Sequence, residues 1–110
     1  MTTQITQEHK NQFEEIKKRL TSIGSKEGNF LKIELLFYEA ITIARTYGDD
    51  MEDNKLLAAL KQLQVNQFQD TKAFFKKSTQ REQVIRRFIS QFKLILSGAC
   101  KNLYALSHSA

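Results

Sequence analysis

The 110-residue chain contains no proline, no tryptophan, a single cysteine and four glycines. A composition without proline and with little glycine contains few residues that interrupt helices. The lone cysteine, Cys100, excludes an internal disulfide, so we expect a reducing, intracellular environment. The N-terminal residues lack the apolar run of a signal peptide, and no apolar segment has the length and low charge of a membrane span. We therefore expect a cytoplasmic protein that folds as one domain over residues 1–110.

Residues 29–47 are the most apolar stretch, because twelve of these nineteen residues are apolar or aromatic. Most of their polar residues are separated by seven, three and four positions, which places them in one narrow stripe of a helix. A helix that is apolar over most of its circumference must be covered on several sides by other elements. We therefore predict a central helix over residues 29–47, with Asn29 as its N-cap.

Three further segments have the apolar periodicity of helices that cover this centre, at about residues 3–23, 53–77 and 79–106. The third helix of the chain, residues 53–77, has Asp50 or Asp53 as its predicted cap and a glutamine-rich part that predicts a kink or break. The seam of the last helix consists of Ile85, Phe88, Phe92, Ile95, Ala99, Leu103 and Leu106. It either continues to residue 106 or breaks at Gly98. Short connections predict an all-α fold, an antiparallel up-down four-helix bundle of one domain.

Charge is distributed unevenly along the chain. Residues 1–55 carry a net charge of −2, whereas residues 56–110 carry +7. A basic cluster in the second half comprises Lys72, Lys76, Lys77, Arg81, Arg86 and Arg87. In the predicted bundle these residues lie at the tip of the hairpin between the third and fourth helices, with Phe74 and Phe75 among them. The acidic loop at residues 49–53 lies at the opposite end. The cluster is our candidate binding site for an anion or a partner.

No motif in the sequence predicts catalysis, a cofactor or a metal. The acidic loop lacks the glycine and glutamate positions of an EF-hand, so its carboxylates are interpreted as helix caps. Neither His9 nor His108 has the Glu-x-x-His spacing of a di-iron bundle. Cys100 has no adjacent histidine or second cysteine that would activate its thiol. We therefore expect a protein that is not an enzyme.

The remaining functional prediction is a small helical module that binds a protein partner through the basic tip. The alternative is a domain that binds anionic membranes or phosphoinositides through the same residues. Nucleic acid is the less favoured partner, because no recognition motif accompanies the basic residues. A homodimer is a further prediction, through the apolar end of the last helix at Leu103, Tyr104 and Leu106.

Overall fold

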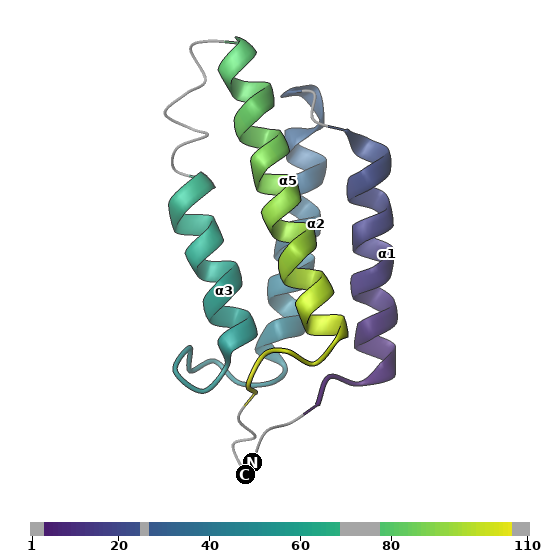
Figure 1. Cartoon of the computed structure of the whole chain (residues 1–110), viewed down its shortest axis with the longest axis vertical. Coiled ribbons are helices and arrows are strands. Elements are labelled where there is room, and N and C mark those ends of the chain that lie inside the picture. The colour runs from purple at the N-terminus through teal and green to yellow at the C-terminus, as the bar shows by residue number, and fades with distance from the viewer. Residues whose placement is uncertain (1–3, 25–26, 69–77, 107–110) are drawn as a thin grey trace.

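The computed structural model describes residues 4–24, 27–68 and 78–106, with side-chain positions for all of these except residues 27, 67, 68 and 78–81. Four α-helices form within the described residues (Figure 1): α1 (Gln7–Ile23), α2 (Phe30–Arg45), α3 (Lys55–Leu63) and α5 (Ser78–Cys100). A 3₁₀-helix, η1 (Glu27–Asn29), precedes α2, and a π-helix, η2 (Gln64–Phe68), follows α3. The described part of the chain contains no strand, so the all-α prediction is confirmed.

Helix α1 begins at Gln7, later than the predicted start near residue 3, because Thr6 has an extended backbone and caps the helix. The Thr6 side chain accepts a hydrogen bond from the His9 backbone N–H at 3.2 Å. This bond satisfies one of the N–H groups that a helix start leaves without a partner. Gly24 ends the helix as predicted, with a φ of 79°.

Asn29 occupies the N-cap position of α2 as predicted, but its side chain makes no capping hydrogen bond. Its amide Nδ2 instead donates to the carbonyl oxygen of Ile23 at 2.7 Å, which ties the start of α2 back to the end of α1. The turn of η1 leads directly into α2 with Asn29 already in helical conformation. The Asn29 side chain is therefore bonded to the end of α1 and not to the first N–H groups of α2.

Phe37 of α2 lies fully buried at the centre of the core. Its ring centroid is 5.3 Å from those of both Phe88 and Phe92 on α5. The buried apolar residues of all four helices belong to one cluster, and the predicted α5 seam supplies Ile85, Phe88, Phe92 and Ala99 to it. Helix α2 thus contributes to the core as predicted, but it is not the sole centre, because α5 also contacts α1, α2 and α3.

One face of α2 is nevertheless uncovered, although most of its circumference is apolar. Helices α1, α3 and α5 all contact α2, but Leu31, Leu35 and Tyr38 are 66%, 61% and 44% exposed. These three residues are spaced by four and three, which places them on one face of a helix. We call them the α2 stripe.

Helix α3 is shorter than predicted, and its cap is neither Asp50 nor Asp53. The fully buried Asn54 caps it by accepting a hydrogen bond from the Leu57 N–H at 3.0 Å. The Asn54 amide also donates to the carbonyl oxygens of Ala44 and Gly48, both at 2.8 Å. A carboxylate has no hydrogen to donate to these carbonyls, which explains why asparagine occupies the position.

The glutamine-rich part of the third helix, where a kink or break is predicted, contains a change of helix type. The α-helix ends at Leu63 and the chain continues as the π-helix η2 from Gln64 to Phe68. The rest of the predicted helix, residues 69–77, lies outside the described residues.

Helix α5 continues through Gly98 and ends at Cys100, so the prediction of a helix to residue 106 is wrong. Asn102 adopts a φ of 56°, and the N–H groups of Asn102 and Leu103 bond to the carbonyls of Ala99 and Gly98. This pattern is a Schellman motif, which terminates helices at a left-handed residue. Leu103 is consequently 71% exposed, whereas Leu106 is buried and bridges to Asn54.

Gly98 accommodates a close approach of the chain that follows α5. A Cβ atom at this position would lie 2.8 Å from Cε2 of Tyr104. The Tyr104 ring therefore packs directly on the backbone of Gly98, and a side chain at this position would clash with it. Of the three residues predicted to form a homodimer contact, only Leu103 is strongly exposed. The homodimer prediction therefore depends on Leu103.

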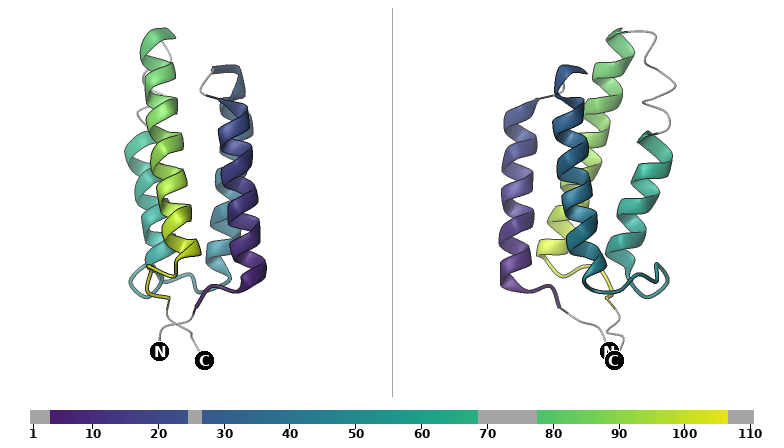
Figure 2. Two further views of the ribbon diagram at one scale, coloured as in Figure 1. Left: turned by 45° about the vertical axis from the view of Figure 1, so that its right-hand side comes forward. Right: turned by 180° about the vertical axis from the view of Figure 1, so that it is seen from behind.

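The segment before α1, the loop between α2 and α3 and the segment after α5 gather at one end of the molecule (Figure 2). The Ile5 N–H donates to Oδ1 of Asn102 at 3.1 Å, and the Thr6 N–H donates to the Tyr47 hydroxyl at 3.0 Å. The ends of α1 and α2 that face the 24–29 turn lie at the opposite end (Figure 1).

Candidate functional site

The structure describes only part of the predicted basic cluster. Lys72, Lys76 and Lys77 lie outside the described residues, as do Phe74, Phe75 and the side chain of Arg81. Arg86 and Arg87 lie on α5 and are exposed. Arg86 lines a shallow depression with Lys93 and Thr21, whereas Arg87 does not. The structure therefore brings Arg86 together with one basic residue, Lys93, that the sequence prediction did not include.

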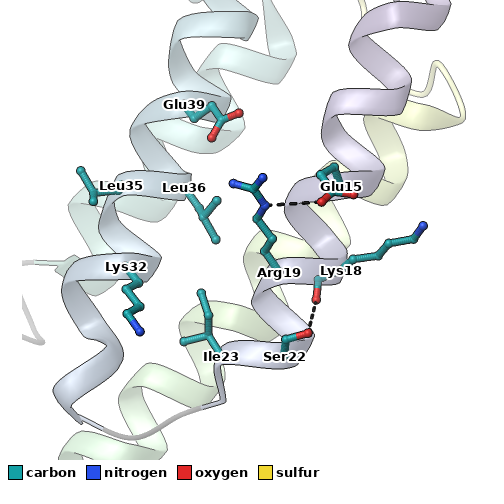
Figure 3. Close-up of a pocket in the computed structure, with 9 residues that line it drawn as sticks. All are labelled: Glu15, Lys18, Arg19, Ser22, Ile23, Lys32, Leu35, Leu36 and Glu39. Atoms are coloured by element: carbon teal, nitrogen blue, oxygen red, sulfur yellow. Dashed lines mark hydrogen bonds and ion pairs between the residues drawn. The ribbon is translucent and has the colours of Figure 1, made fainter.

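A groove of about 470 Å³ runs between α1 and α2 (Figure 3). Its floor is apolar, because Leu36 is buried and Ile23 is partly buried between the two helices. Leu35 lines its α2 side and belongs to the exposed α2 stripe. The complete lining consists of Glu15, Lys18, Arg19, Ser22, Ile23, Lys32, Leu35, Leu36 and Glu39. We call this the α1/α2 groove.

Charged side chains of both signs surround the α1/α2 groove. Arg19 reaches between the helices and pairs with Glu15, with 3.4 Å between Nε and Oε1. Lys32 and Glu39 lie toward opposite ends of the groove on α2 (Figure 3), and neither makes an ion pair with the described residues. The groove thus has an unpaired positive charge at one end and an unpaired negative charge at the other.

A second groove, of about 540 Å³, lies on the other side of α1, against α5. We call it the α1/α5 groove. Lys18 lines both grooves, but its side chain points away from α2 (Figure 3). The lining consists of Glu14, Lys17, Lys18, Thr21, Ser22, Lys93 and Ser97. Three of these seven side chains are cationic, three carry hydroxyl groups and one is acidic.

Two lysines cross the α1/α5 groove in opposite directions. Nζ of Lys17 donates to Oγ of Ser97 at 3.2 Å, and Nζ of Lys93 donates to Oγ1 of Thr21 at 3.0 Å. Lys17 also pairs with Glu14 at 2.9 Å, and this interaction lowers the pKa of the Glu14 carboxyl, with a further contribution from Cys100. Sequence reasoning missed this pairing because the bonded residues are far apart in the chain. The available signal was that a hydroxyl residue follows each lysine by one turn on the same helix, Thr21 after Lys17 and Ser97 after Lys93.

His9 has a structural environment at the base of α1. Its Nδ1 lies 2.5 Å from the hydroxyl of the buried Tyr47, which also accepts the Thr6 N–H. These contacts join α1 to the end of α2. His108 lies outside the described residues. The structure thus places His9 in a contact that holds the fold together.

The environment of Cys100 makes its thiol unreactive. Its Sγ–H donates to the Lys10 carbonyl oxygen at 3.7 Å. Burial, followed by the hydrogen bond and the charge of Glu14, raises the pKa of the Cys100 thiol to about 11. The thiol therefore stays protonated at neutral pH, and the thiolate is the nucleophilic form of cysteine.

We expect Cys100 in the folded protein to react about tenfold more slowly with iodoacetamide at pH 8 than in the urea-unfolded chain. At pH 8 the raised pKa lowers the thiolate fraction more than a hundredfold. The greater nucleophilicity of a more basic thiolate recovers roughly tenfold of that loss, which is close to half of it on a logarithmic scale. Mass spectrometry of timed samples measures the two rates. Equal rates in the folded and unfolded chain would contradict the protected thiol.

The acidic loop carries hydrogen bonds of its own. Oδ1 of Asp50 accepts from the Glu52 N–H at 2.9 Å, and the carboxylates of residues 49, 50, 52 and 53 are exposed. Within the described residues, no three histidines, cysteines or carboxylates are grouped so that they could hold a metal ion. None of the described helices combines the length and the apolarity needed to cross a bilayer.

The two grooves beside α1 differ in chemistry, because one has an apolar floor and the other is lined by lysines and hydroxyl groups. Comparison with known proteins adds no assignment to them. No protein-family model matches the chain, and no curated protein or solved structure is significantly similar to it.

Proposed function

We propose that the protein is a non-enzymatic binding module that receives an amphipathic helix of a partner protein. The observation that carries this proposal is the exposed α2 stripe, Leu31, Leu35 and Tyr38, of which Leu35 also lines the α1/α2 groove with its apolar floor. Large apolar side chains aligned on one exposed face are typical of interaction surfaces, whereas isolated ones are common on any protein. A helix in a groove is a frequent form of peptide recognition.

The dimensions of the stripe fit a helical ligand. Leu31 and Tyr38 are seven residues apart, which corresponds to roughly 10 Å along a helix axis. A partner helix with apolar residues at i, i+4 and i+7 presents anchors over the same length. Its side chains would pack on Leu35 and reach the floor formed by Leu36 and Ile23.

The charges at the two ends of the groove define the partner further. Lys32 and Glu39 are also seven residues apart, and neither is paired within the described structure. A partner helix with an acidic residue at one end and a basic residue about two turns away would satisfy both. Complementary charges of this kind mainly determine orientation and specificity, while the apolar anchors supply affinity.

The predicted basic tip would provide a further contact with the same partner. In an antiparallel up-down bundle, the start of α2 lies at the same end as the hairpin that carries Lys72, Lys76, Lys77, Arg81, Arg86 and Arg87. An acidic segment that continues from the partner helix beyond Lys32 would then meet these residues. The described members, Arg86 and Arg87, are exposed and available for such a contact.

A selection from displayed helical peptides tests the proposal. The library fixes leucine at i, i+4 and i+7 and randomises the other positions. We expect enriched peptides to carry Asp or Glu at one end and Lys or Arg seven residues away. Substituting Leu35→Glu is expected to weaken their binding tenfold or more, as measured by fluorescence anisotropy, because a charge replaces a desolvated anchor.

Leu94→Glu is the matched control, because Leu94 is 66% exposed, close to the 61% of Leu35, but lies on α5. It should leave peptide affinity within twofold. The double variant Lys32→Glu, Glu39→Lys should prefer peptides with the two charges exchanged. Peptides that bind Leu35→Glu as tightly as the original protein would refute the proposed site, as would a concentration-dependent dimer that buries Leu35.

The alternative function is binding to anionic membranes through the basic tip. The exposed positions of Arg86 and Arg87 favour keeping it as a second candidate. Charge reversal of both arginines to glutamate should abolish co-sedimentation with anionic vesicles at low salt, because the electrostatic contribution is about 1 kcal/mol per basic residue near such a surface. Absence of vesicle binding by the unsubstituted protein would eliminate this candidate.

A further inference from the structure

The α1/α5 groove concentrates positive charge from two helices. Helix periodicity explains how: Lys17 and Thr21 are four residues apart on α1, and Lys93 and Ser97 are four residues apart on α5. Each pair therefore lies on one face of its helix, and the two faces meet in the groove. Arg86 lies seven residues before Lys93 and lines the adjoining depression with Lys93 and Thr21.

Hydroxyl groups hold the two crossing lysines in place. The Thr21 hydroxyl donates to the Lys17 carbonyl at 3.0 Å, and the Ser97 hydroxyl donates to the Lys93 carbonyl at 2.9 Å. Both hydroxyl oxygens are therefore free to accept from the opposite lysine, as they do. An ammonium group has three hydrogens, so the bond from Lys93 to Thr21 leaves two that can be donated to a ligand.

The groove contains more positive than negative charge. Glu14 is its single lining carboxylate and is paired with Lys17. Lys18 and Lys93 form no ion pair with the described residues, and Lys18 points to this side of α1. Because cations drawn together without counter-charges repel one another, an anion that enters the groove is stabilised by all of them.

We propose that the α1/α5 groove binds a phosphate group, with Lys17, Lys18 and Lys93 as its cationic contacts and Arg86 at its edge. Phosphate monoesters and pyrophosphate carry close to two or more negative charges near pH 7, which matches several ammonium groups better than a single carboxylate does. The groove volume of about 540 Å³ accommodates a phosphorylated molecule or headgroup larger than phosphate alone. This site lies on a different side of α1 from the partner-helix groove, although Lys18 and Ser22 line both, and the proposal does not rest on the partner-helix site.

Titration with sodium pyrophosphate tests this site in the intact protein, at constant ionic strength adjusted with sodium chloride. We expect saturable NMR shifts in the backbone amides of residues 17–22 and 93–97. Lys93→Gln should weaken the affinity tenfold or more, and Lys93→Arg should retain most of it because the charge remains. Circular dichroism verifies that each variant is folded.

Lys55→Gln is the charge-matched control, since Lys55 is exposed at the start of α3. Its affinity for pyrophosphate should stay within twofold of the original. Shifts that rise linearly without saturation, or an equal loss of affinity in Lys55→Gln and Lys93→Gln, would overturn the proposal. Either result would show general attraction to a basic protein.

A second arm of the experiment identifies the source of the phosphate. The protein is sedimented with vesicles of phosphatidylcholine and phosphatidic acid, and with vesicles of phosphatidylcholine and phosphatidylglycerol as the control for negative charge. Retention on phosphatidic acid that Lys93→Gln abolishes would identify a lipid headgroup. Saturable pyrophosphate binding without such retention would identify a soluble phosphorylated ligand. Failure of both arms would overturn the site, whatever the result of the peptide selection.

Discussion

Replacing Phe37 by alanine is expected to lower the free energy of unfolding by about 3–5 kcal/mol. The Phe37 ring is fully buried and packs against both Phe88 and Phe92, so its removal leaves a cavity at the point where α2 meets α5. The lost aromatic pairs add to the loss of burial. Because small domains have roughly 5–15 kcal/mol of stability in total, the variant should be close to unfolding.

Urea denaturation followed by circular dichroism measures this effect. Leu35→Ala is the matched control on the same helix, since Leu35 is 61% exposed. We expect it to change the free energy of unfolding by less than about 0.5 kcal/mol, as exposed positions usually do. A similar loss in both variants would mean that the α2 stripe is buried in solution, and it would also contradict the proposed partner site.

The second large effect is expected for Asn54→Ala, with a loss of about 2–4 kcal/mol. The substitution removes the N-cap of α3, which is worth about 1 kcal/mol, and leaves buried carbonyl groups without a donor, at about 1–3 kcal/mol. The affected acceptors are the carbonyl oxygens of Ala44 and Gly48, 2.8 Å from Nδ2 of Asn54. Thermal and urea denaturation both report the loss.

Asn54→Asp separates the two contributions. Aspartate keeps the oxygen that caps α3 but has no amide to donate to the carbonyls, so we expect it to be at least as destabilising as alanine at neutral pH. Asn66→Ala is the control, because Asn66 is exposed and its side chain bonds only to Gln62 in the described structure. An aspartate variant as stable as the original would show that capping alone explains Asn54.

The sequence predicted the helices well because their signal is local. Apolar residues at intervals of three and four indicate which face of a helix is buried, and Phe13, Ile16, Leu20, Phe88 and Phe92 are buried accordingly. The pattern does not specify how many neighbours cover a helix. For this reason the α2 stripe was expected to be buried, although Leu31 and Leu35 are among the most exposed apolar residues.

Caps and helix ends were predicted less well because tertiary contacts decide between similar local choices. Asp50, Asp53 and Asn54 are all good capping residues. Only Asn54 can also donate to the carbonyls at the end of α2 and in the loop that follows it. At the end of α5, Leu103 continues the apolar spacing, yet Asn102 turns the chain away. The position of a helix end depends on one or two residues, whereas the buried face of a helix is indicated by many residues together.

The candidate sites lay beyond sequence reasoning for a different reason. The crossing contacts of the α1/α5 groove join residues 80 and 72 positions apart, and a single sequence contains no record of such pairs. The sequence cluster around residues 72–87 was recognised because its members are neighbours in the chain. Of that cluster, Arg86 lines the depression that it shares with Lys93.

The contact between Ile5 and Asn102 has a consequence for how the protein can be joined to others. Since the segments before α1 and after α5 are joined by this hydrogen bond, the chain enters and leaves the bundle at the same end. A short linker could connect residues 4 and 106 into a circular permutant with new ends in the 24–29 turn. By the same geometry, the whole bundle could be inserted into a surface loop of a host protein, with the far end of α1 projecting outward.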